Sequence, residues 1–145
     1  MERVIPVHPP SVPPMLKVLL IDDEPRLVRA WERLFASEPG IELVGTRDRA
    51  DCLLSTVTEL KPDVVVIDLT MPGVDPLDAI RQLVAAEPAT HCVVYSAHGA
   101  PDILRAAHDA GARGYIDKVR APMEMFPTIR RVAAGEVVFP EKCGW

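Results

Sequence analysis

The stretch VVVIDLTMPG, residues 64–73, runs four β-branched apolar residues directly into a carboxylate, Asp68. An unbroken apolar run of this kind is typical of a strand that is buried on both faces of a parallel sheet. A Met-Pro-Gly turn follows the carboxylate almost at once. Burying an unpaired charge at the end of such a strand is costly. The stretch therefore predicts a buried strand whose Asp68 is held charged by its neighbours.

Similar apolar runs recur along the chain and alternate with helical patterns. The expected strands cover residues 15–21, 41–46, 63–67, 91–96 and 113–117. The expected helices cover 25–35, 50–60, 76–84 after an Asp75 N-cap, 101–110 closed by Gly111, and the segment between Pro122 and Gly135. Trp31 lies on the apolar face of the first helix and is expected in the core. Five strand–helix units predict an α/β fold, a doubly wound parallel sheet with right-handed crossovers.

Length and composition suit one domain of 15–136 between two tails. Residues 1–14 hold five of the fifteen prolines and predict a flexible arm, and 137–145 are expected to form a C-terminal tail. The net charge of −5 argues against direct nucleic-acid binding by this chain. No apolar run approaches the roughly 18 residues of a membrane span, and the first 14 residues resemble neither a signal peptide nor a transit peptide. We therefore expect a cytoplasmic protein without a membrane partner.

The three cysteines have no C-x-x-C spacing, so a disulfide framework or a zinc site is not expected. Cys52 and Cys92 are expected to be small hydrophobic residues in or near the core.

Polar residues lie at the carboxyl ends of four of the expected strands, at the sheet edge where ligands bind in this architecture. They are Asp22, Asp23 and Glu24, then Asp68, then Ser96, then Asp117 and Lys118. Any one of them alone is explained by helix capping, a turn or a solvated surface charge. Together they predict one site, because crowded carboxylates favour Mg²⁺ and a carboxylate in such a site can accept a phosphoryl group. A lysine and a metal would neutralise the transferred charge, and a serine would donate a hydrogen bond to a phosphoryl oxygen.

The chain resembles the receiver domain of bacterial two-component response regulators over about residues 15–136. The likeness is carried by VLLIDDEP (18–25), VVVIDLTMPG (64–73), VVYSA (93–97) and GYIDK (114–118). The resemblance implies a flavodoxin-like (βα)5 fold with strand order 2-1-3-4-5. It implies a signalling switch, not an enzyme in the metabolic sense, which assists only its own phosphorylation and dephosphorylation. The implied partners are a sensor histidine kinase and a second copy of the chain.

For the site, the resemblance implies that Asp68 is the phospho-acceptor and that Asp23 and Asp68 bind Mg²⁺ together with the backbone carbonyl of Thr70. Asp22 would help to hold the metal through water.

The resemblance also implies roles for Lys118 as the essential lysine, Ser96 as the switch hydroxyl and Tyr115 as the switch aromatic. Phosphorylation would then change the surface formed by the fourth helix, the fifth strand and the fifth helix, which serves dimerisation or partner binding. Thr70 and His98 lie two positions beyond Asp68 and Ser96, where the family tunes the lifetime of the phosphoryl group.

The segments AGARGYIDK and TIRRVAAGEVVFP are similar to receivers that precede a helix-turn-helix DNA-binding domain. The residues EKCGW that follow are too few for a recognition helix, so a stand-alone receiver and an excised one both remain open. A phosphorylation-independent protein–protein interaction module is the alternative function. A phosphohydrolase is disfavoured, because its D-x-D-x-T motif would need a second aspartate where Thr70 stands.

Two positions depart from the family pattern. Val119 follows Lys118 where the family often has proline, so a cis peptide is not expected there. Pro127 falls inside the last helix, which predicts either a kink near 123–127 or a helix that begins only at Pro127.

Overall fold

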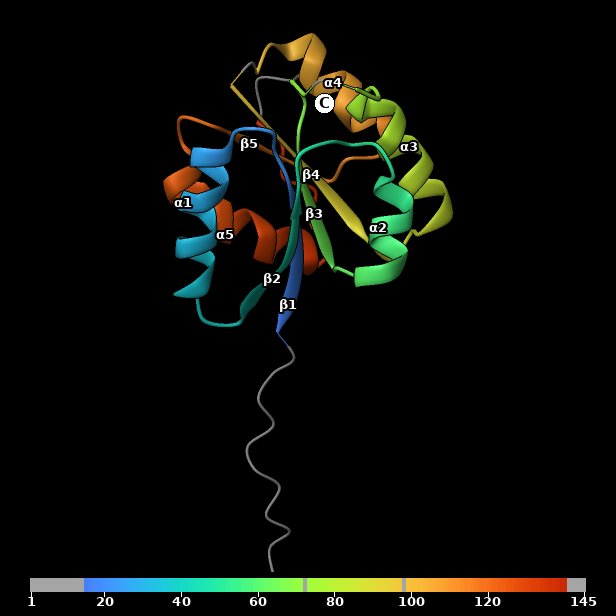
Figure 1. Ribbon diagram of the computed structural model, residues 1–145. Helices are drawn as coiled ribbons and strands as arrows, with labels where there is room; N and C mark the ends of the chain where they lie inside the picture. Colours follow the sequence, from blue (N-terminus) through green and yellow to red (C-terminus); the bar gives the residue numbers. More distant parts are fainter. Residues whose placement is uncertain (1–14, 72, 98, 141–145) are drawn as a thin grey trace, which may run out of the picture.

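A computed structural model describes residues 15–71, 73–97 and 99–140. Its centre is a parallel sheet in the order β2-β1-β3-β4-β5 (Figure 1). The strands are β1 (Leu16–Ile21), β2 (Ile41–Arg47), β3 (Val64–Asp68), β4 (His91–Ser96) and β5 (Gly114–Asp117). The predicted α/β architecture and the strand order 2-1-3-4-5 are confirmed. Within the described ranges, no helix has both the length and the apolar character that a membrane crossing requires.

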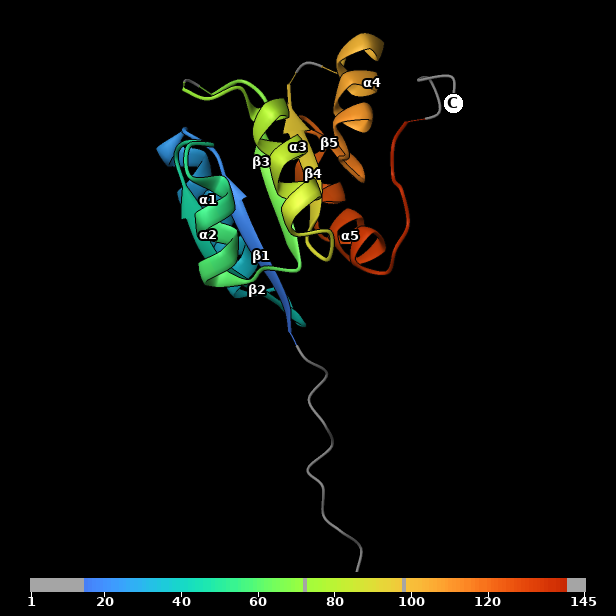
Figure 2. The same ribbon diagram turned by 90° about the vertical axis from the view of Figure 1, so that its right-hand side faces the viewer.

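Five helices cover the two faces of the sheet. They are α1 (Pro25–Ala36), α2 (Leu53–Leu60), α3 (Pro76–Ala86), α4 (Pro101–Ala110) and α5 (Ala121–Ala133). Helices α1 and α5 pack on one face, and α2, α3 and α4 pack on the other (Figures 1 and 2). Each face has its own apolar core because successive residues of a strand point to opposite sides.

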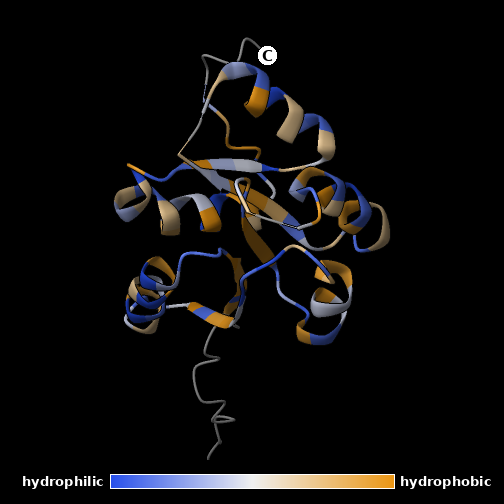
Figure 3. Ribbon diagram, turned by 45° about the horizontal axis from the view of Figure 1, so that its top comes forward, coloured by the Kyte–Doolittle hydropathy of each residue, from blue (hydrophilic) through white to orange (hydrophobic). Residues whose placement is uncertain are grey.

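Strand β3 shows this arrangement most clearly. All five of its residues are buried. Val64 and Val66 enter the core beneath α1 and α5, whereas Val65 and Ile67 enter the core beneath α2, α3 and α4. Apolar colour accordingly concentrates on the central strands, while the helices show mixed colours (Figure 3). The continuous apolar run in the sequence therefore reports burial on both faces.

The helix ends follow the expected capping chemistry with one correction. Asp75 accepts a hydrogen bond from the Leu77 amide at the start of α3, and Gly111 ends α4 with a φ of 111°. Helix α2 begins at Leu53 because Cys52 has a φ of 62°, outside the helical region. Cys52 is exposed, so its predicted place in or near the core is wrong, whereas Cys92 is buried as predicted. Leu53 takes the inward position instead.

Helix α5 contains Pro127 and is continuous from Ala121 to Ala133. The alternative in which the helix begins only at Pro127 is therefore wrong; the kink stays a prediction. The helix tolerates proline here because Pro127 is exposed, and so is Met123, whose carbonyl loses its usual amide donor. Water can reach that carbonyl on the outer face of the helix. Among the described residues no peptide bond is cis, including the one before Val119.

The segment 136–140 returns from α5 along the outer edge of β5 (Figure 2). The Val138 amide donates to the Arg113 carbonyl at 2.8 Å, and the Tyr115 amide donates to the Val138 carbonyl at 3.0 Å. The Phe139 ring meets the His108 ring of α4 edge-on, with centroids 5.4 Å apart. The first part of the expected tail is thus attached to the sheet. The expected arm 1–14, His98 and residues 141–145 lie outside the described residues.

Candidate phosphorylation and metal site

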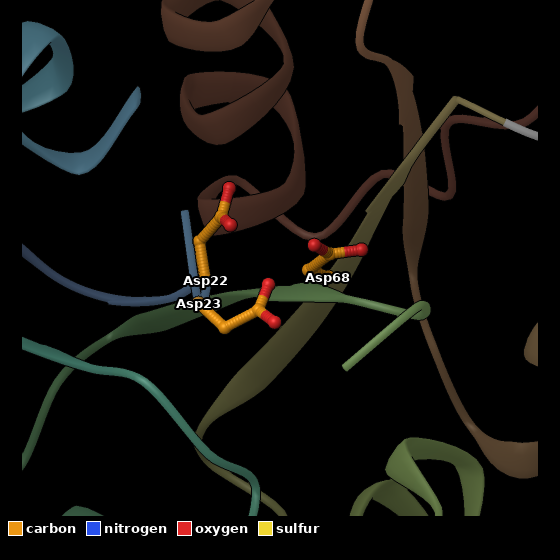
Figure 4. A group of neighbouring side chains, drawn as sticks. All are labelled: Asp22, Asp23 and Asp68. Atoms are coloured by element: carbon orange, nitrogen blue, oxygen red, sulfur yellow. The ribbon is translucent and has the colours of Figure 1, made fainter. Parts of the chain in front are cut away.

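Three carboxylates meet at the carboxyl edge of the sheet (Figure 4). Asp22 and Asp23 follow β1, and Asp68 ends β3, which pairs with β1 in parallel so that Ile21 lies beside Ile67. One oxygen from each carboxylate lies within 4.8 Å of the others. Asp22 and Asp68 are each only 1% exposed, whereas Asp23 is exposed. The group therefore combines two buried charges with one that opens to solvent.

Both oxygens of the Asp68 carboxylate accept hydrogen bonds. Lys118 Nζ donates to Oδ2 at 2.9 Å, and the Thr70 amide and hydroxyl donate to Oδ1 at 2.9 and 2.8 Å. Lys118 is supplied by the segment after β5, on the far side of β4 from Asp68. Donors of this kind stabilise the ionised form of a buried carboxylate. Asp68 is therefore a buried carboxylate whose two oxygens are paired with an ammonium and with the Thr70 donors.

Asp22 is less well satisfied. Its Oδ1 accepts from the Glu24 amide at 3.0 Å, but Oδ2 is buried and lacks a hydrogen-bond partner. Lys118 Nζ lies 3.6 Å from Oδ2, which is an ion pair without a hydrogen bond. Burial raises the pKa of Asp22, and the neighbouring charges of Asp68 and Asp23 add to the increase. An orphaned carboxylate oxygen beside two further carboxylates fits a hard divalent cation such as Mg²⁺.

Lys118 carries the positive charge of the site. Burial alone would lower its pKa, but the hydrogen bond to Asp68 and the charges of Asp22 and Asp68 raise it overall. Its side chain is 21% exposed, so the ammonium lies at the boundary between the core and the site opening. Lys118 therefore remains protonated across the physiological range of pH.

Ser96 and Tyr115 are joined through the backbone. The Ser96 carbonyl accepts from the Lys118 amide at 3.0 Å and from the Tyr115 hydroxyl at 3.1 Å. The Tyr115 ring is 6% exposed, and burial raises the pKa of its phenol to about 12. The hydroxyl lies so close to Gly99 that a Cβ there would approach it to 2.6 Å. Tyr115 is thus already turned inward in this structure.

The structure brings the predicted site residues together at the carboxyl edge of the sheet, except that Tyr115 lies near the start of β5 and reaches the edge through its hydroxyl. Thr70 has contacts beyond its predicted carbonyl, because its amide and hydroxyl both donate hydrogen bonds to the Asp68 carboxylate. Sequence reasoning gave Tyr95 no role, although its ring lies beneath Lys118 with Nζ 4.9 Å from the ring centroid. Its position directly before Ser96 in VVYSA was the available signal.

Sequence comparisons show which protein family this chain belongs to. The profile of the response regulator receiver domain matches residues 18–130. Response regulator GacA of Pseudomonas aeruginosa is 36% identical over 122 residues, which cover 84% of this chain and 57% of GacA. The nitrate/nitrite response regulator protein NarL of Escherichia coli is 31% identical over 124 residues, which cover 86% of this chain and 57% of NarL. The chain thus spans little more than half the length of these relatives.

Solved structures of response regulators are also similar to this chain. The crystal structure of a two-component response regulator of the LuxR family from Aurantimonas sp. SI85-9A1 has a TM-score of 0.82 at 28% identity, covering 89% of this chain and 92% of that one. The non-phosphorylated receiver domain of the stress response regulator RcsB from Escherichia coli has a TM-score of 0.79, covering 88% and 99% of the two chains. At 23% identity, this second likeness shows the fold alone.

Proposed function

Because the chain belongs to the response regulator receiver domain family, we propose that it is a phosphorylation-controlled signalling switch in which Asp68 accepts a phosphoryl group. The main support for this proposal comes from the contacts that Asp68 makes. Asp68 is a buried carboxylate that accepts a hydrogen bond from Lys118 at 2.9 Å and is grouped with two further carboxylates that suit Mg²⁺.

In the proposed step, a carboxylate oxygen of Asp68 forms a bond to phosphorus. The bond between phosphorus and the donor breaks, and its electron pair leaves with the donor. The donor is the phosphohistidine of a sensor histidine kinase, or a small phosphodonor. The product is an aspartyl phosphate, which places about two negative charges where Asp68 carried one.

The residues of the site would divide the work. The Lys118 ammonium would move its hydrogen bond from the Asp68 carboxylate to a phosphoryl oxygen. The Ser96 hydroxyl would donate a hydrogen bond to another phosphoryl oxygen. Asp22, Asp23, Asp68 and the Thr70 carbonyl would hold Mg²⁺. When bound, the cation would supply positive charge that relieves the repulsion among the carboxylates and the incoming phosphoryl group.

The signal would pass from the site to β5. Tyr115 already bonds the Ser96 carbonyl through its hydroxyl and the Val138 carbonyl through its amide. The phosphoryl group would therefore stabilise an inward Tyr115 that exists beforehand, and so shift the population of the surface formed by α4, β5 and α5.

That surface offers groups for a partner or a second copy of the chain. Val119 and Met123 are 82% and 73% exposed beside the Arg120–Glu124 ion pair at the start of α5. Apolar groups flanked by charge are typical of protein interfaces. We propose dimerisation or partner binding here, with control of transcription as the output that the relatives GacA and NarL suggest.

Intact-protein mass spectrometry tests the proposal. The chain is incubated with a small phosphodonor, with Mg²⁺ or with EDTA, beside Asp68→Asn and Asp117→Asn. Asp117 also ends a strand, but its carboxylate accepts from the Val119 amide, which an asparagine oxygen can replace. One added phosphoryl group that requires Mg²⁺, persists in Asp117→Asn and disappears in Asp68→Asn is the expected result.

No adduct in the folded wild-type chain with several donors would overturn the proposal. The interaction module that works without phosphate would then be the better description.

A further inference from the structure

The Tyr95 ring separates the phosphorylation site from the aromatic core beneath it. Tyr95 is 1% exposed and lies beside Asp68 in the pairing of β3 with β4. Lys118 Nζ stands 4.9 Å from the centroid of its ring. That distance is within the range at which an ammonium is attracted to the face of an aromatic ring. Lys118 therefore has an uncharged contact in addition to its two carboxylates.

The ring is itself held in place. Trp31 Nε1 of α1 donates to the Tyr95 hydroxyl at 3.0 Å. Trp31 is 2% exposed and packs edge-on against Phe35 and Phe126, with both pairs of centroids 6.1 Å apart. Helices α1 and α5 thus fix the tyrosine from the side opposite the site. A ring anchored at its hydroxyl and packed in the core has little freedom to move.

Such a support matters because a lysine side chain is intrinsically flexible. A lysine ammonium is a point charge on a flexible four-carbon stem, and this side chain is 21% exposed. Its hydrogen bond to Asp68 involves the same carboxylate that must react. When that carboxylate forms a bond to phosphorus it loses its full charge. The ring keeps its attraction for the ammonium throughout, because its contact does not depend on the charge of Asp68.

We propose that Tyr95 is a positioning residue for phosphoryl transfer, whose ring, anchored by Trp31, holds the Lys118 ammonium over Asp68. This inference rests on the proposed function and adds a residue to its site. The plain alternative is that Tyr95 only fills the core. The two differ in one respect: a positioning residue acts through Lys118, whereas a core residue affects the whole site.

The test measures the rate constant of phosphorylation by a small phosphodonor at several Mg²⁺ concentrations. Tyr95→Met fills similar space without a ring, Tyr95→Leu serves as a second variant, and Tyr95→Phe keeps the ring. Phe35→Leu is the matched control, since Phe35 packs against Trp31 in the same core. Each variant is studied at a temperature at which circular dichroism shows it folded, and Tyr95→Met is repeated in a Lys118→Ala background.

The expected result for Tyr95→Met is a rate constant lower by roughly threefold to tenfold, the range of a partly desolvated cation–aromatic contact. The Mg²⁺ concentration for half-maximal rate should not change, Tyr95→Phe should restore most of the rate, and Phe35→Leu should keep it. In the Lys118→Ala background, Tyr95→Met should cause no further loss.

Two results would overturn the inference. The first is a folded Tyr95→Met or Tyr95→Leu variant with the wild-type rate. The second is an equal loss with and without Lys118, or a weakened Mg²⁺ dependence, because either would show a general effect on the core. A folded wild-type chain that takes no phosphoryl group would instead remove the proposed function, and the role of Tyr95 with it.

Discussion

Replacing Asp22 by asparagine should stabilise the metal-free protein. Asp22 is 1% exposed, and its Oδ2 has no hydrogen-bond partner. Asparagine keeps an oxygen that can accept from the Glu24 amide and removes one of three crowded negative charges. The lost group is also the charge whose pKa burial raises. The substitution therefore relieves a cost that the folded protein bears when no cation is bound.

The expected gain follows from the distances. The carboxylate oxygens lie no more than 4.8 Å apart, and two like charges at that limit repel by about 3.5 kcal/mol at an effective dielectric constant of about 20. Opposite charges 3.6 Å apart attract by about 4.6 kcal/mol under the same conditions. Repulsion from Asp23 and Asp68 together thus exceeds the attraction of Lys118 by roughly 2 kcal/mol. Solvent screens the exposed Asp23, so we expect about 1–2 kcal/mol in the free energy of unfolding, or about 3–8 °C in Tm.

The effect should depend on pH in a defined direction. Because the folded-state pKa of Asp22 lies above 3.8, the folded protein retains a proton at pH values where the unfolded chain has lost it. Wild-type stability therefore falls as pH rises from 3.8 through the folded-state pKa, and the full cost is present above it. Asp22→Asn lacks this decline, so its advantage should grow over that window.

Urea titrations followed by circular dichroism, in EDTA and at low ionic strength, measure this difference. Added Mg²⁺ should stabilise the wild type by binding only the folded state, and should stabilise Asp22→Asn less. Asp102→Asn, which removes an exposed acid from the first turn of α4, is the control and should show no gain. An Asp22→Asn variant that is no more stable than the wild type at any pH in EDTA would refute the electrostatic reasoning.

Three further predictions concern the surroundings of the site. Lys118→Ala should lower the free energy of unfolding, measured in urea titrations, by about 2–4 kcal/mol. The substitution removes the ammonium that is paired with the two buried carboxylates of Asp22 and Asp68. A loss below about 1 kcal/mol would contradict this reasoning. Val138→Pro removes the amide that donates to Arg113 and should cost about 1 kcal/mol. Faster hydrogen exchange at the Tyr115 amide would show that segment 136–140 has detached from β5. Unchanged protection of that amide would argue against the pairing. Gly99→Ala should displace the Tyr115 ring, because the new Cβ would lie 2.6 Å from its hydroxyl, and unchanged ring resonances in NMR spectra would disprove it.

The fold was predictable because its determinants are local. The apolar run before Asp68 reports a doubly buried strand, and Asp75 with Pro76 marks the start of α3 without reference to any distant residue. The alternation of strands and helices then leaves a parallel sheet as the natural arrangement. The sheet in turn brings the strand ends to one edge, so the meeting of Asp22, Asp23 and Asp68 could also be predicted.

Other features depend on packing that the sequence does not encode locally. Cys52 is exposed and lies just before α2, which begins three residues later than the predicted start at residue 50. Val138 pairs with β5 because the chain turns back after α5. Trp31 meets Tyr95 across 64 residues of sequence. Each of these contacts depends on how the helices pack against the sheet, and that packing depends on the shapes of many side chains together.

The sequence by itself predicted the alternation of strands and helices, the edge of the site and Asp68 as its central carboxylate, because periodicity, turn chemistry and strand-end charges act over a few residues. The strand order 2-1-3-4-5 came from the resemblance to receiver domains. The tertiary structure alone decided that Asp22 Oδ2 is orphaned, that Tyr115 is turned inward, and that Tyr95 lies under the Lys118 ammonium. These depend on distances of a few ångströms between side chains far apart in the chain. A pattern of residue types contains no such distances, and only the packed core establishes them.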